Sequence, residues 1–260
     1  MIEIYRNFLF HDIYKFASLV EECIGDPQMF FELGIEKDET LVNRIIKPHK
    51  LTLLHEYIFA MIRTWQSRDY RKNPDAHEQN EAQRLAPIFS EYRIPLTTFP
   101  TDDTFSESED EFYNWFVENE DSFERYWTIV TDEIFHITFS NRRFLERFGA
   151  SLAEYIRLKL PRNSTAYTLI GEKVARPHRY PSWLKKAIFY RDHGRCVFCM
   201  CDLSGLVATD RRLHLDHIVP LNQGGSNDPS NFQLLCAACN IKKSDGRPRA
   251  GTLYVPWWEY

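Results

Sequence analysis

The chain lacks any apolar run that approaches the ~20 residues of a membrane-spanning helix. Its first segment, MIEIYRNFLFHD, has neither the basic lead nor the cleavage site of a secretory signal peptide. We therefore expect a soluble, cytoplasmic protein that contacts no membrane. In that reducing compartment cysteines stay as thiols and are available to a metal.

Sequence motifs that the chain lacks exclude two further classes of enzyme. No GxxxxGKS or GxxxxGKT sequence is present, so the chain has no phosphate-binding loop for an ATPase motor of its own. His55-Glu56 and His77-Glu78 are not followed by a second histidine at helical spacing, which excludes HExxH metal chemistry. We find no internal repeat. With 260 residues, 43% hydrophobic and 15% aromatic, the chain can build two packed domains.

The N-terminal part is predicted to be a mostly helical domain, residues 1–160. Apolar residues recur at helical spacing over 51–65 and 74–92, with Pro87 bending or splitting the second helix. Short helices are expected over 140–149 and 152–160, the latter capped by Ser151 and Glu154. Residues 161–181, which contain Gly, Pro and small polar residues, are predicted to link this domain to a second one, 182–260.

Four of the six cysteines form two Cys-x-x-Cys pairs: Cys196 and Cys199, then Cys236 and Cys239. Two such pairs supply four thiolates, the ligand set of a closed structural Zn²⁺ site. Unconnected thiols or disulfides are the alternative, which the absence of a secretion signal disfavours. Cys201 lies close enough to compete as a ligand, and the isolated Cys23 is expected to be a buried thiol.

Asp216-His217 and Asn240 carry the predicted chemistry. A carboxylate is a hard ligand that suits Mg²⁺, and a neutral imidazole can take a proton from water. Neighbouring side chains on a strand point to opposite faces, so Asp216 and His217 can serve two different roles. Asn240 offers a second oxygen ligand, and a zinc site at Cys239 would fix its position.

The segments RCVFC, LDHIVPLNQGGSNDPSN and LLCAACNIKK together resemble the HNH endonuclease family, of the ββα-metal type. The resemblance covers about a third of the chain. It implies that His217 is the general base, that Asp216 and Asn240 bind Mg²⁺ or Mn²⁺, and that Asn231 holds the intervening loop and orients the imidazole. The last family histidine is Asn240 here, an HNN variant, which favours these hard cations over softer metals.

The expected fold class is α+β, a mostly α-helical N-terminal domain followed by a small zinc-stapled ββα-metal domain. A helix capped by Ser182 is predicted over 183–191, and strands over 206–208 and 213–215. Residues 231–243 are predicted to form one helix that turns Leu234, Leu235 and Ile241 inward.

Charge is divided unevenly along the chain. From residue 171 onward there are 13 Lys and Arg against 8 Asp and Glu, a net +5, whereas 19 against 29 precede it, a net −10. The positive charge of the C-terminal part therefore favours binding to a polyanion. The candidate phosphate contacts are Lys243, Arg191 and Lys242. Acidic residues alternate with aromatic ones over 102–124. They are either a solvated face over an aromatic core or a docking surface for a basic protein partner.

The sequence thus predicts an endonuclease that cleaves DNA, with a structural Zn²⁺ and a catalytic Mg²⁺ or Mn²⁺. RNA stays open as a substrate, and the oligomeric state is unknown from sequence. The architecture is associated with effectors of bacterial restriction or anti-phage (antiviral) defence. Two alternatives remain: a non-catalytic zinc-stapled module that binds nucleic acid, and an effector subunit active only with a sensor or ATPase partner.

Overall fold

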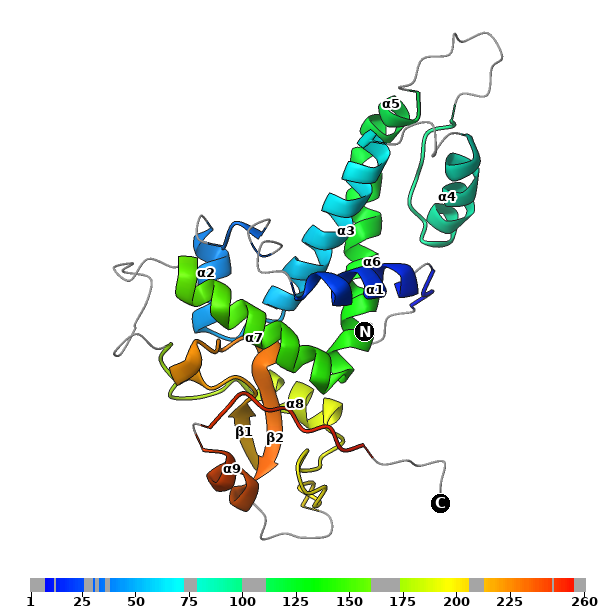
Figure 1. Ribbon diagram of the computed structural model, residues 1–260. Coiled ribbons are helices and arrows are strands. Elements are labelled where there is room, and N and C mark those ends of the chain that lie inside the picture. The colour runs from blue at the N-terminus through cyan, green and yellow to red at the C-terminus, as the bar shows by residue number, and fades with distance from the viewer. Residues whose placement is uncertain are drawn as a thin grey trace. The chain divides into compact units, whose positions relative to one another are not determined.

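The structure, a computed structural model, describes residues 8–11, 13–25, 30, 33–35, 38–72, 79–99, 111–159, 174–205, 213–244 and 246–254 (Figure 1). The chain divides into two compact units. The first unit comprises residues 1–20 and 58–135, and the second unit comprises 21–57 and 136–260. This division differs from the predicted one, because segments from within 1–160 belong to the unit that carries the C-terminal residues. The predicted linker, 161–181, lies partly outside the described residues.

The first unit is helical. It contains α4 (Gln79–Glu91) and α5 (Glu111–Glu118), while α1 (Ile13–Cys23), α3 (Leu53–Lys72) and α6 (Glu120–Ser140) contribute residues to both units. Packed aromatic rings form its core, with centroid distances of 4.8 Å for Phe116–Phe123, 4.8 Å for Phe89–Tyr126 and 5.2 Å for Tyr70–Phe116. Among the described helices none combines the length and hydrophobicity needed to cross a membrane.

The acidic block of the sequence falls partly on this unit. Its residues 102–110 lie outside the described part of the chain. Glu118, Glu120 and Asp121 are exposed, while Phe112 and Trp115 are buried beneath the same stretch. The described part therefore has the form of a solvated acidic face over an aromatic core.

The predicted N-terminal helices are present, with one correction. The helices expected over 51–65 and 74–92 are α3 and α4, and α4 contains Pro87. The two short helices expected on either side of Gly149 are a single helix, α7 (Arg142–Lys159). Gly149 does not end it. A Cβ at this position would lie 3.0 Å from Val219 Cγ2 and 3.5 Å from Asn231 Oδ1, so the glycine permits close packing of α7.

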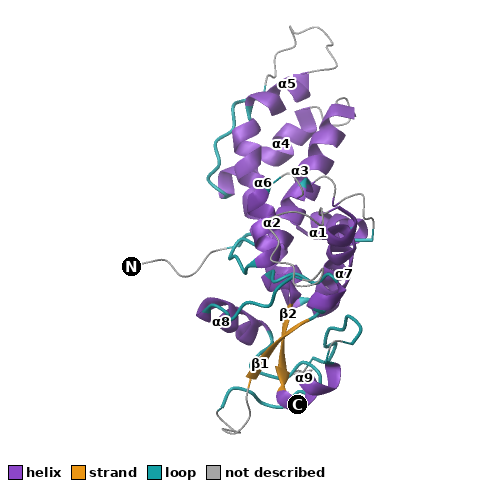
Figure 2. Cartoon of the chain, turned by 90° about the vertical axis from the view of Figure 1, so that its left-hand side faces the viewer, coloured by secondary structure: helices purple, strands orange, loops and turns teal. Residues whose placement is uncertain are grey.

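The second unit combines helices with a two-stranded antiparallel sheet (Figure 2). Its remaining elements, in chain order, are α2 (Glu39–Ile46), α8 (Ser182–Arg191), β1 (Leu213–His217), η4 (Leu221–Gln223), η5 (Pro229–Asn231), β2 (Phe232–Cys236) and α9 (Ala237–Lys243). The register places Asp216 opposite Gln233 and His217 opposite Phe232. Leu184 and Ile188 of α8 pack with Leu234 and Leu235 in its core. The predicted α+β class is confirmed.

Two local predictions in this unit are wrong. Residues 231–243 are not one helix, because 232–236 form β2 and only Ala237–Lys243 is helical. Ile241 is 76% exposed instead of buried. Phe232, Gln233, Leu234 and Leu235 are all fully buried, so both strand faces are covered and the alternation that marks a strand is absent. Likewise Ser182 is the first helical residue, and the cap position is Pro181. The strand expected over 206–208 lies outside the described residues.

The loop between β1 and β2 is attached to segments that come early in the chain. The amide of Asn227 donates to the carbonyl of Ile45 over 2.8 Å. The buried Asp228 accepts from the amide of Leu53, the first residue of α3, over 2.7 Å. A carboxylate at a helix N-terminus also interacts favourably with the helix dipole. Residues 45–53 are therefore part of the wall that supports this loop.

Candidate active site and metal centre

Cysteine thiols gather at one point of the second unit. The Sγ atoms of Cys196, Cys199, Cys201 and Cys236 all lie within 4.8 Å of one another. Four thiolates at this spacing can surround one Zn²⁺ tetrahedrally. A cluster of four cysteines is confirmed, with three of the four predicted ligands in it, and the donor set fits zinc. Cys201, named from sequence as a competing ligand, is a member of the cluster.

The fourth predicted ligand, Cys239, borders the same cluster. Burial and the neighbouring thiols of Cys236, Cys199 and Cys196 raise its pKa. At Cys199, burial acts in the same direction, but hydrogen bonds from Cys201 and the other thiols outweigh it and lower the pKa to about 7. A thiolate at neutral pH is the form that binds a metal. Because a tetrahedral ion takes four ligands, Cys201 and Cys239 are two candidates for the fourth position.

A cavity of about 630 Å³ lies between the end of β1 and α9. Asp216 and His217 line it from β1, and Asn240 lines it from α9. The other polar or charged residues of its wall are Arg176, Asn222, Lys243 and Ser244. The structure therefore brings together the predicted metal ligands and the predicted general base. Asn240 directly follows Cys239 in the chain, so one of these residues is connected to the cysteine region.

His217 is held as a neutral imidazole. It is 2% exposed and packs against Phe232 and Tyr180, with ring centroids 4.4 Å and 6.4 Å away. Burial, with smaller effects from Arg176 and Lys243, lowers its pKa to about 3 although the bond to Asn227 opposes the shift. A neutral imidazole has one nitrogen free to accept a proton.

The hydrogen bonds of Asn227 decide which nitrogen that is. Its Nδ2 donates to the carbonyls of Ile46 and Ala175, both at 2.8 Å. Its Oδ1 must then face His217 Nε2, 3.0 Å away, as an acceptor. Nε2 therefore carries the proton, and Nδ1 is left as the basic nitrogen of His217.

Asp216 is a buried carboxylate with one oxygen engaged. Its Oδ2 accepts from Gln233 Nε2 over 2.8 Å and lies 3.0 Å from Lys243 Nζ. Burial raises the pKa of Asp216, and the nearby Lys243 counteracts part of that effect. Within the described residues no hydrogen bond is made to Oδ1, so this is the oxygen left to bind a cation.

Asn231 lies where a loop-holding residue is needed. Its Oδ1 accepts from the amide of Val219 over 2.8 Å, and its Nδ2 donates to the carbonyls of Val219 and Ser226 over 3.0 and 2.8 Å. The hydrogen bond to His217, however, comes from Asn227 rather than from Asn231. The two tasks expected of Asn231 are thus divided between two asparagines.

The candidate phosphate contacts differ sharply in their surroundings. The Arg191 side chain is 2% exposed and binds Asp192 and the carbonyl of Phe232, so its charge does not reach solvent. The Lys243 side chain is 3% exposed and donates to the carbonyl of His217 over 2.7 Å as well as pairing with Asp216. Lys242 is exposed. Of the three, Lys242 alone presents its charge to solvent.

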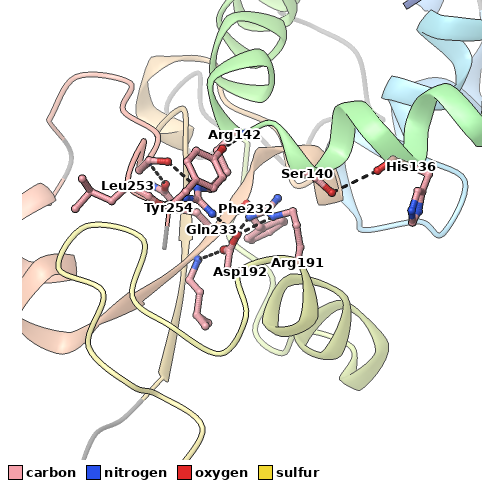
Figure 3. Close-up of polar contacts among 11 residues, drawn as sticks. His136, Ser140, Arg142, Arg191, Asp192, Phe232, Gln233, Leu253 and Tyr254 are labelled. Atoms are coloured by element: carbon pink, nitrogen blue, oxygen red, sulfur yellow. Dashed lines mark hydrogen bonds and ion pairs between the residues drawn. The ribbon is translucent and has the colours of Figure 1, made fainter. Parts of the chain in front are cut away.

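Residues 249–254 form a strap that reaches this site. Arg142 anchors the strap by donating to the carbonyls of Gly251, over 2.6 Å, and Leu253 (Figure 3). The guanidinium of Arg142 also lies 4.2 Å from the ring of Tyr254. On its other side the strap meets Gln233, which accepts from the amide of Gly251 over 3.1 Å and donates to the carbonyl of Arg249 over 2.8 Å. Gln233 thereby connects the strap to Asp216.

Sequence reasoning missed Asn227, Gln233 and Arg176. A signal existed for Asn227, because it follows the GGS turn within the quoted motif. Gln233 stands opposite Asp216 only once the strand register is known. Arg176 lies in the segment predicted as a linker, and nothing in its neighbours along the chain marks it.

Comparison with protein families agrees with this geometry. Residues 196–246 match the family described as HNH endonuclease, so this part of the chain carries an HNH endonuclease domain, as predicted. At the level of the family this supports nuclease activity, a divalent metal and a nucleic-acid substrate. No curated protein and no solved structure matches the chain.

Proposed function

We propose that this protein is a metal-dependent endonuclease that hydrolyses phosphodiester bonds in DNA. The observation that supports it is the convergence of Asp216, His217 and Asn240 on one cavity, in a unit that also holds the thiol cluster. A carboxylate, an imidazole with a defined tautomer and an amide are the groups that such a reaction needs.

The donor atoms favour a hard cation at the cavity. Asp216 Oδ1 and the side-chain oxygen of Asn240 are both oxygen ligands, which suit Mg²⁺ or Mn²⁺. When bound, the ion supplies Lewis-acid stabilisation of the phosphate and of the departing oxygen. A structural Zn²⁺ would be held by four of the five cysteines Cys196, Cys199, Cys201, Cys236 and Cys239.

The chain itself performs the proton transfer and the positioning. His217 Nδ1 accepts a proton from the attacking water as its oxygen forms the new bond to phosphorus and the 3′ oxygen departs. Asn227 orients the imidazole, because two hydrogen bonds to backbone carbonyls fix the side chain whose Oδ1 faces His217. Gln233 and Lys243 hold Asp216 from the side away from Oδ1.

The test is cleavage of supercoiled plasmid by purified, zinc-loaded protein with Mg²⁺, Mn²⁺ or EDTA. His217→Asn should lower the rate by about 10² to 10⁴ while leaving DNA binding intact, since general-base catalysis contributes that much. His214→Asn, on the same strand, is the matched control. Equal cleavage by wild type and His217→Asn would overturn the mechanism. Binding without cleavage of plasmid, single-stranded DNA or RNA would instead favour the non-catalytic module.

For the biological setting we propose a cytoplasmic effector of restriction or anti-phage defence. The supporting feature is a nuclease cavity joined to a separate helical unit with exposed acidic residues, which a basic sensor or ATPase partner could engage. Phage plating on cells that express wild type or His217→Asn tests it. Protection by the wild type alone is expected, and equal plating on both would contradict the proposal.

A further inference from the structure

The cavity wall contains two cations with different surroundings. The ammonium of Lys243 is already paired, because it contacts the carboxylate of Asp216 and the carbonyl of His217. Arg176 is exposed. Among the residues that the structure describes, its guanidinium makes no hydrogen bond and no ion pair. The wall therefore presents one uncommitted positive charge beside the predicted catalytic groups.

The backbone on the N-terminal side of Arg176 is held in place. Val174 is 5% exposed, and the carbonyl of Ala175 accepts from Asn227 Nδ2 over 2.8 Å. The same Asn227 side chain binds His217 Nε2. One amide thus fixes the residue preceding Arg176 and the imidazole together. The guanidinium charge also acts on both Asp216 and His217, which agrees with its position in the wall.

The surroundings of Arg176 are unlike those of the structural arginines in this unit. The side chain of Arg142 is 4% exposed and binds backbone carbonyls as well as Asp192 (Figure 3). The side chain of Arg191 is 2% exposed and forms a two-contact pair with Asp192. Arg176 is exposed and has no hydrogen-bond or ion-pair partner within the described ranges, so the packing seen there gives no reason for an arginine.

We propose that Arg176 binds the scissile phosphate and stabilises the negative charge that develops on its non-bridging oxygens. The proposal rests on the nuclease function proposed above. A guanidinium presents paired donors that match two phosphate oxygens, and a charge-assisted pair of this kind is about twice as strong as a neutral hydrogen bond. Arg176 lies outside the segment 196–246 that matches the family, so that match assigns it no role.

The experiment compares Arg176→Ala and Arg176→Lys with Arg179→Ala. Arg179 is an exposed arginine in the same segment that does not line the cavity, which makes it the matched control. Cleavage of a short duplex in Mg²⁺ gives kcat and KM. Binding of the same duplex in Ca²⁺ gives a readout that needs no turnover. Circular dichroism and zinc content verify that each variant is folded.

We expect Arg176→Ala to lower kcat by about 10² to 10³, the usual loss when one donor to a developing charge is removed. Arg176→Lys should retain intermediate activity, because it keeps the charge and loses the paired donors. Arg179→Ala should stay within about twofold of wild type, as expected for an exposed surface charge. Added guanidinium ion, at concentrations too low to unfold the protein, should restore part of the activity of Arg176→Ala alone.

The outcomes separate this inference from the proposed function. If wild type cleaves and Arg176→Ala behaves like Arg179→Ala, the role of Arg176 is wrong and the nuclease stands. If wild type does not cleave, the nuclease function is wrong, and the binding measurement then tests whether Arg176 contacts a phosphate. Weaker duplex binding by Arg176→Ala than by Arg179→Ala would support a contact between Arg176 and phosphate. Equal binding by the two variants would overturn that contact.

Discussion

Lowering the pH from about 7.5 to about 5 should destabilise the fold through His217. Burial holds the pKa of the folded imidazole at about 3, whereas an unfolded histidine titrates near 6.5. Between these values the unfolded chain binds the proton and the folded chain does not, so stability falls as the pH falls below about 6.5. At pH 5 the difference of about 1.5 pH units corresponds to about 2 kcal/mol of lost stability.

The assay compares urea unfolding of wild type and His217→Asn at the two pH values. The variant lacks the titrating group, so its loss of stability should be smaller by about 2 kcal/mol. Weaker zinc binding at acid pH affects both proteins and cancels in the difference, provided their zinc contents agree. His214→Asn, which keeps His217, should respond to acid as wild type does.

A direct measurement accompanies the unfolding data. In protein labelled with ¹³C at the histidine Cε1 positions, the resonance that disappears in His217→Asn should not shift above about pH 5, since a pKa near 3 leaves the ring neutral there. A midpoint near 6.5 for that resonance would refute the burial argument. So would an identical acid response of wild type and His217→Asn.

Three other predictions concern the support of the site. Gln233→Met should weaken cleavage about 10- to 100-fold and raise the Mg²⁺ concentration required, because Asp216 loses the partner that orients it; an unchanged metal dependence would contradict this. Gly251→Ala should cost about 1 to 3 kcal/mol in thermal unfolding, since its Cβ would lie 2.3 Å from the carbonyl of Val197, whereas Gly25→Ala meets nothing within 4 Å and serves as control. Cys201→Ser and Cys239→Ser should each retain zinc, as four thiols remain, and the double variant should lose it; measured zinc loss from either single variant would exclude the shared position.

The sequence was sufficient for the parts of the site that depend on local order. Each Cys-x-x-Cys pair keeps its two sulfurs close in sequence, so a thiol cluster could be predicted from spacing, although Cys201 and not Cys239 is among its four members. Asp216 and His217 are adjacent and Asn240 directly follows Cys239, so the family motif leaves few positions for these side chains. The helices α3 and α4 were predictable because buried residues recur along each at spacings of three and four.

The sequence was insufficient where burial is complete or where distant segments meet. Phe232 to Leu235 are buried on both faces, which removes the period that separates a strand from a helix. Glycine often marks a helix end, so the sequence predicts one at Gly149, yet the small size of this residue permits close packing against Val219. The carbonyls of Ile46 and Ala175 accept hydrogen bonds from Asn227 although both residues are far from it in the sequence, and no local pattern predicts those contacts.

Residues 249–254 follow every residue of the cavity lining in the chain, so they are synthesised after it. Until they dock, Gln233 lacks two of its three partners and cannot hold Asp216 rigidly. A nascent chain that already displays His217 and Asn240 therefore has an incomplete carboxylate site.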